Sequence, residues 1–61
     1  MAHTGKFQIY KDKKGEWRWR LVARNGRIVA DSAEGYKTKW GAWKAVKTVI
    51  EIVKNSKIKM A

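Results

Sequence analysis

Hydrophobic and polar residues alternate through the N-terminal half of the chain, in segments separated by glycine, asparagine and aspartate. Phe7 and Ile9 occupy alternate positions of residues 6–10, and the longest alternation, in residues 16–24, sets Trp, Leu and Ala against mostly Arg. A period of two residues is typical of half-buried β-strands. The pattern therefore predicts an antiparallel sheet with strands at residues 6–10, 16–24 and 27–31.

Turn residues between the last two segments predict how those strands pair. Asn25 and Gly26 form the dipeptide typical of a two-residue type I′ turn, in which both residues have positive φ. Such a turn places Arg24 opposite Arg27 and fixes every following pair. The expected pairs are Ala23 with Ile28, Val22 with Val29, Leu21 with Ala30, and Arg20 with Asp31.

The loop of the first hairpin must keep the apolar side chains on one face. A three-residue loop at 13–15, with Gly15 left-handed, pairs Ile9 with Trp19. A four-residue loop would instead set Phe7 opposite Arg20 and scatter the apolar residues, so we expect the three-residue loop. The apolar face of the sheet then comprises Phe7, Ile9, Trp17, Trp19, Leu21, Ala23, Ile28 and Ala30.

An amphipathic helix is predicted at residues 39–54, where the apolar positions recur at the helical period. Thr38 is a suitable N-cap and Asn55 a suitable end. Lys47 and Glu51 are spaced for an i,i+4 ion pair. The stripe expected to cover the sheet comprises Ala42, Val46, Val49, Ile50 and Val53, with Trp43 and Ala45 at its margins.

The C-terminal tail alternates as well, since Ile58 and Met60 stand between lysines, and this predicts a short fourth strand at 57–60. The predicted fold class is therefore α+β. It consists of a three-stranded antiparallel sheet, one amphipathic helix on one face of it, and a short C-terminal strand.

Length and charge limit how such a fold is stabilised. The chain has 61 residues, 15 Lys and Arg against 5 Asp and Glu, a net charge of +10, one His and no Cys. A domain this small is near the lower limit for folding alone, and without cysteines neither a disulfide framework nor a zinc cluster is available. We expect a single domain over residues 1–61, with a flexible N-terminus at 1–4, that forms a homodimer.

Catalysis and membrane insertion are not expected. His3 has no partner in the sequence pattern, the carboxylates are scattered, and no phosphate-binding glycine loop is present. We therefore expect no enzymatic activity, no cofactor and no metal. No segment resembles a signal peptide or a membrane span, so the expected location is cytoplasmic and membrane binding is not expected.

Four segments occur in a fixed order: GKFQIYK at 5–11, WRWRL at 17–21, NGRIVA at 25–30 and EGYKTK at 34–39. Together they resemble the YegP-like family of small uncharacterised domains, over residues 5–54. The resemblance implies a unit of three strands, a helix and a strand. It also implies that two units share one continuous sheet and exchange the last strand, so this single unit would form a homodimer with residues 57–60 exchanged. The family brings no established chemistry with it.

A cationic outer sheet face is the main functional signal. All four arginines lie on the second and third predicted strands, whereas the lysines lie elsewhere. Arginine binds phosphate through a planar fork, so a folded domain of charge +10 favours contact with the phosphate backbone of DNA or RNA, without strong sequence specificity. Tyr10, opposite Arg18, either stacks on a base or lies under the guanidinium. The candidate nucleic-acid-binding residues are Lys6, Tyr10, Arg18, Arg20, Arg24 and Arg27.

The alternative is a structural or protein-interaction dimer whose charge serves solubility or an acidic protein partner. Trp40 falls on the polar side of the predicted helix, which is unusual for this residue. It packs under the loop at 35–36, lies in a subunit contact or touches a ligand, whereas Trp17, Trp19 and Trp43 are expected in the core. The predicted dimer-interface residues are Trp40, Ile58 and Met60.

Overall fold

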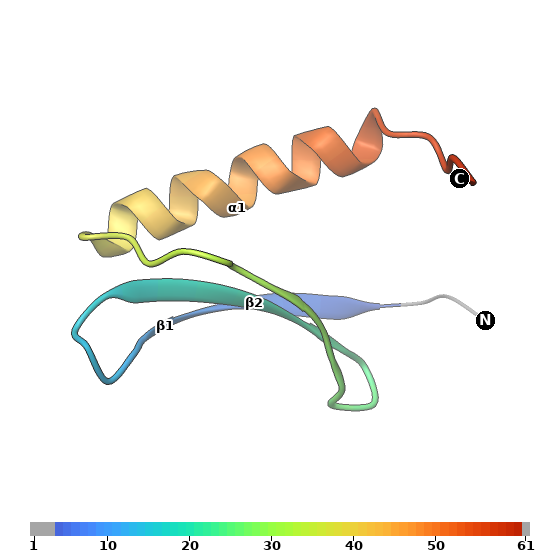
Figure 1. Ribbon diagram of the computed structural model, residues 1–61. Coiled ribbons are helices and arrows are strands. Elements are labelled where there is room, and N and C mark those ends of the chain that lie inside the picture. The colour runs from blue at the N-terminus through green and yellow to red at the C-terminus, as the bar shows by residue number, and fades with distance from the viewer. Residues whose placement is uncertain (1–3, 61) are drawn as a thin grey trace.

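The computed structural model describes residues 4–60 and confirms the α+β class (Figure 1). One antiparallel sheet holds the strands in the order β1-β2-β3, and the single helix follows it in the chain. The elements are β1 Gly5–Lys11, β2 Trp17–Ala23, β3 Ile28–Asp31 and α1 Lys39–Lys54.

The N-terminal prediction falls mostly outside this range. Residues 1–3, with His3, are not among the described residues, so the expected flexibility of residues 1–4 is untested there. Thr4 is described, and its carbonyl oxygen accepts a hydrogen bond from the backbone N–H of Arg24 at 2.9 Å.

The first hairpin has the predicted loop and register. Ile9 lies opposite Trp19 and Phe7 opposite Leu21. Gly15 has a φ of 85°, the left-handed conformation that the three-residue loop requires. The apolar residues of β1 and β2 therefore share one face, as the alternation predicts.

The second hairpin differs from the prediction, because Gly26, at φ 89°, is the only residue of its turn with positive φ. Asn25 keeps a negative φ, and its Oδ1 accepts a hydrogen bond from the backbone N–H of Arg27 at 3.0 Å. The N–H of Ala23 donates to the carbonyl of Arg27 at 2.8 Å. The loop thus has three residues, 24–26, and the predicted type I′ turn is wrong because the asparagine side chain stabilises a different turn.

A β-bulge then restores part of the expected register. Leu21 pairs with Ala30 and Arg20 with Asp31 as predicted, but Val22 pairs with Ile28, and the register shifts at this point. The predicted pairs of Arg24 with Arg27, of Ala23 with Ile28 and of Val22 with Val29 are therefore wrong, since Arg27 lies opposite Ala23. Directly paired residues share a face, so Ile28 moves to the outer face beside Val22, where it is 57% exposed.

Helix α1 covers one face of the sheet and leaves the other without a covering element in the described part of the chain (Figure 1). Thr38 caps it, since the side chain accepts from the N–H of Gly41 at 2.9 Å, and the helix ends at Asn55 as predicted. Between helix and sheet, Trp19, Ala42 and Val46 are buried.

The helix packs on β1 and β2 but not on β3, so its apolar stripe is only partly covered. Ile50 and Val53 remain exposed, and Trp43, expected in the core, is 40% exposed. Lys47 lies over the ring of Trp43, and no ion pair joins it to Glu51 in residues 4–60, which corrects that prediction.

Candidate nucleic-acid interface

The outer face of the sheet, defined here as the face turned away from α1, is built from rows of paired residues. Lys6 lies opposite Val22, and Tyr10 lies opposite Arg18. The middle row spans all three strands and consists of Gln8, Arg20 and Asp31.

Arg20 is held in place on this face by two neighbours on β1. Its Nε donates a hydrogen bond to Oε1 of Gln8 at 2.8 Å, and its guanidinium carbon lies 4.7 Å from the centre of the Tyr10 ring. Tyr10 is thus paired with Arg18 in register but lies under the guanidinium of Arg20, its diagonal neighbour. Neither partner carries a negative charge, so the charge of Arg20 is oriented without being neutralised.

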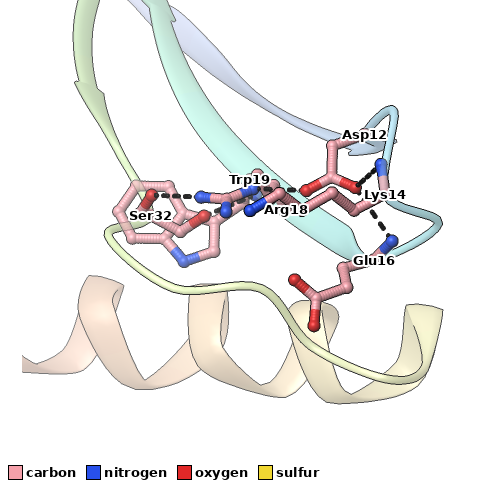
Figure 2. Close-up of polar contacts among 6 residues, drawn as sticks. All are labelled: Asp12, Lys14, Glu16, Arg18, Trp19 and Ser32. Carbon is pink, nitrogen blue, oxygen red and sulfur yellow. Dashed lines mark hydrogen bonds and ion pairs between the residues drawn. The ribbon is translucent and has the colours of Figure 1, made fainter.

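Arg18, in contrast, forms an ion pair with Asp12 (Figure 2). Its Nε lies 2.7 Å from Oδ2 of Asp12, and a terminal nitrogen donates to the carbonyl of Ser32 at 3.4 Å. The other carboxylate oxygen, Oδ1, accepts from the backbone N–H groups of Lys14 and Glu16, each at 2.9 Å. The hydrogen bond from Arg18, followed by that from the N–H of Glu16, holds the pKa of Asp12 below its usual value.

This ion pair distinguishes Arg18 from the other predicted phosphate ligands, and its predicted contact with nucleic acid stays a prediction. Asp12 occupies the Nε of Arg18 and compensates its charge, so Arg18 attracts a phosphate less than an unpaired arginine does, and the pair helps to close the first hairpin. The sequence did contain the signal. Asp12 begins the turn two residues after Tyr10, and the correct register places Arg18 beside it across the hairpin.

Arg24 and Arg27 lie at the exposed β2–β3 hairpin. Within residues 4–60 the pair of Arg18 with Asp12 is the only ion pair, so neither of these arginines, nor Lys6 or Arg20, is bound to a carboxylate there. Arg27 lies opposite Ala23, so it shares the face of Ala23 and is not on the outer face, contrary to the prediction. The outer face and the hairpin beside it therefore present these unpaired cations together with one unpaired carboxylate, Asp31. An anion can approach such a surface without displacing an internal partner.

A pocket of about 390 Å³ lies elsewhere, between the segment after β3 and the helix. Trp19 lies at this pocket, and its indole N–H is buried without a hydrogen-bond partner. Glu34 is the only charged residue of the lining, so the pocket is unsuited to a polyanion. Within residues 4–60 no group of acidic or histidine side chains is placed to hold a metal ion. The lining comprises Trp19, Ser32, Ala33, Glu34, Tyr36, Ala45, Thr48 and Val49.

The predicted dimer residues all lie exposed on this single chain. Ile58 is 97% exposed and Met60 90% exposed, and residues 56–60 form no strand here. Trp40 is 62% exposed and stacks on Trp43. This stacking was not among the three positions that the sequence left open for Trp40, namely under the loop at 35–36, in a subunit contact or against a ligand. The exchanged strand itself is untested, because its partner would be a second chain.

Fold and surface together define a small α+β domain with a cationic sheet face, and no helix in residues 4–60 is long and apolar enough to cross a membrane. Comparison with known proteins then shows the family. The model of the domain of unknown function DUF1508 matches residues 12–59. The chain therefore belongs to this family, the YegP-like domains that its sequence resembles.

Similar proteins occur in archaea and bacteria. A UPF0339 protein of Methanosarcina acetivorans is 45% identical over 53 residues, which cover 87% of this chain and 90% of that protein. A UPF0339 protein of Neisseria meningitidis is 55% identical over 40 residues, 66% of this chain and 70% of that one. The NMR solution structure of a protein from Haloferax volcanii superposes with a TM-score of 0.85 at 33% identity, covering 98% of this chain and all of the other.

Proposed function

We propose that this domain is a cytoplasmic, homodimeric binding module that contacts the phosphate backbone of nucleic acid without strong sequence specificity. The contact surface is the outer sheet face with the β2–β3 hairpin. The observation that carries the proposal is the group of cations without carboxylate partners, namely Lys6 and Arg20 on the outer face and Arg24 and Arg27 at the exposed hairpin.

Arg20 is the best-oriented phosphate ligand of the group. Gln8 occupies its Nε, and Tyr10 supports the plane of the guanidinium from one side. The two terminal nitrogens have no hydrogen-bond partner among residues 4–60 and would bind two oxygens of one phosphate. Because the side chain is already held, less conformational entropy is lost on binding than for a free arginine.

Weak sequence preference follows from the same contacts. Asparagine and glutamine read adenine through a free side-chain amide. The amide oxygens of both Gln8 and Asn25 already accept hydrogen bonds, from Arg20 and from the N–H of Arg27. The remaining attraction is that of positive charge for phosphate, which depends on the release of counterions and not on base identity.

The homodimer rests on a different surface. Ile58 and Met60 are almost fully exposed, and Ile50, Ile52 and Val53 are exposed at the C-terminal half of α1. In the proposed dimer the tail at 57–60 pairs with the sheet of the second copy, which covers apolar side chains that a single chain leaves in water. Two copies would then present two cationic faces to one nucleic-acid molecule.

Charge-matched variants test the nucleic-acid contact. The first carries Arg20→Gln, Arg24→Gln and Arg27→Gln, and the control removes the same charge through the exposed residues Lys13, Lys14 and Lys54, each changed to Gln. Fluorescence anisotropy with a labelled DNA duplex at low salt should show a loss on the order of a hundredfold for the first variant and a much smaller loss for the control. Equal losses would mean that net charge alone attracts DNA. No binding by the unchanged protein would favour the structural or protein-interaction dimer.

A further inference from the structure

Two tryptophans stack on the outer surface of α1. The rings of Trp40 and Trp43 lie nearly parallel, with 4.7 Å between their centroids and 9° between their planes. Trp40 is 62% exposed and Trp43 40% exposed. One face of Trp40 is covered by Trp43, so its exposed area includes the opposite face of the ring.

This pair contributes little to the core. The residues of α1 that pack against the sheet are Ala42 and Val46, and Trp40 lies on the opposite side of the helix. Large aromatic side chains normally lie inside a domain or at a contact with another molecule, and tryptophan is enriched at such contacts. The position of Trp40 therefore points to a partner outside the described chain.

Positive charge surrounds the pair. The Nζ of Lys47 lies 5.3 Å from the centre of the Trp43 ring, and Lys44 stands one helical turn after Trp40. Glu51 is the only carboxylate in α1 and lies beyond these lysines toward the helix end. An aromatic face beside unpaired lysines has the chemistry that binds a stacked, negatively charged ligand.

We propose that Trp40 and Trp43 form a stacking platform for the unpaired bases of single-stranded nucleic acid. A base continues the stack on the open face of Trp40, and Lys44 and Lys47 neutralise the phosphates that flank it. Every base offers a π-face, so binding tolerates different sequences. A duplex has its bases already stacked, so it gains nothing from this platform.

The platform does not distinguish DNA from RNA. Recognition of RNA requires a group that hydrogen-bonds the 2′-hydroxyl, and the proposed contacts use only the base face and the phosphates. Figure 1 shows α1 on one side of the sheet, and the cationic face is the one turned away from α1. Trp40 lies on the side of α1 that faces away from the sheet, so the platform and the proposed phosphate contact can be tested independently.

Single-strand binding is tested with short oligodeoxyadenylate and oligoadenylate, followed by tryptophan fluorescence and by anisotropy of the labelled strand. Both probes should quench the fluorescence with similar affinity. Trp40→Ala should weaken binding by about 5- to 150-fold, because one stacked base contributes roughly 1–3 kcal/mol. Trp40→Phe should retain most of the affinity. The matched control is Val29→Ala, which removes an exposed apolar side chain from β3, outside α1.

Further measurements on the same variants separate this inference from its alternatives. Trp40→Ala should leave duplex binding unchanged, and the triple variant at Arg20, Arg24 and Arg27 should retain the quenching by single strands. If Trp40→Ala binds single strands as tightly as the unchanged protein does, the proposed stacking platform is wrong. A lower sedimentation mass for Trp40→Ala would overturn it too, since Trp40 would then be a subunit contact.

Discussion

Replacing threonine by alanine is expected to have opposite effects on stability at the N-cap of α1 and in the interior of the helix. Thr38 is the N-cap, and its hydroxyl oxygen accepts a hydrogen bond from the N–H of Gly41 at 2.9 Å. Thr48 lies inside the helix, where its hydroxyl donates to the carbonyl of Lys44 at 3.1 Å. Replacement by alanine removes the same atoms from both positions but has a different energetic consequence at each.

The magnitudes follow from these contacts. Thr38→Ala leaves a helix-end N–H without its acceptor and should cost about 1 kcal/mol. Thr48→Ala removes a β-branched residue whose hydroxyl bonds back to the helix, so it should stabilise by about 0.5 kcal/mol. A domain of this length has a total stability of roughly 3–9 kcal/mol, so the two variants should differ by a measurable fraction of it.

Thermal unfolding followed by far-UV circular dichroism measures this difference. A change of about 1 kcal/mol shifts the Tm of so small a domain by about 4–8 °C, so Thr38→Ala should melt below the unchanged protein and Thr48→Ala slightly above it. Trp40 lies in the capped first turn, so Thr38→Ala should also weaken the single-strand quenching. A neutral Thr38→Ala, or a Thr48→Ala that destabilises more, would refute this account of the helix start.

Three further predictions concern the hairpins and the tail. The pKa of Asp12 is lowered in the folded state, so its carboxylate stabilises the fold at a pH above its ordinary pKa of 3.8. This stability is lost as the pH falls below 3.8, and the acid-induced loss of stability should therefore be smaller in Asp12→Asn. An acid profile equal to that of the unchanged protein would contradict the ion pair with Arg18. Gly26→Ala should lower the free energy of unfolding, measured in urea, by about 1–2 kcal/mol. The cost comes from the backbone, because φ is 89° and no atom lies near the added methyl group. An unchanged urea midpoint would exclude that backbone cost. Deleting residues 56–61 should lower the sedimentation mass, whereas an unaltered dimer would disprove the exchanged strand.

The helix and the first hairpin were predictable because several signals agree there. Thr38, the apolar period and Asn55 define the same helix, and Gly15 together with the alternation permits one register only. Local preference and burial point to the same structure in both elements, which is the condition under which sequence patterns are reliable.

The second hairpin was not predictable in the same way, because its turn has two low-energy solutions. Asn25 and Gly26 suit a type I′ turn, but the asparagine side chain also stabilises the three-residue loop that the structure has. The resulting bulge moves Ile28 to the outer face, a change that alternation alone cannot indicate.

The sequence predicted the sheet face on which Arg18 and Arg20 lie, but not which partner binds each guanidinium. The strand period correctly places Arg18 and Arg20 on the outer face, yet one is bound by a carboxylate and the other by an amide. That distinction depends on Asp12 and Gln8, which only the register and the turn geometry bring within reach. Long side chains can choose among several partners, and their sequence spacing does not decide between them.

Salt dependence tests the central claim most directly, because it measures the number of phosphates neutralised. If one chain binds a duplex through its four unpaired cations, the logarithm of the association constant should fall with the logarithm of salt concentration with a slope of about −3.6. The triple variant at Arg20, Arg24 and Arg27 should have a slope of about −0.9. Equal slopes for the two proteins would show that these arginines do not contact the phosphates and would contradict the account.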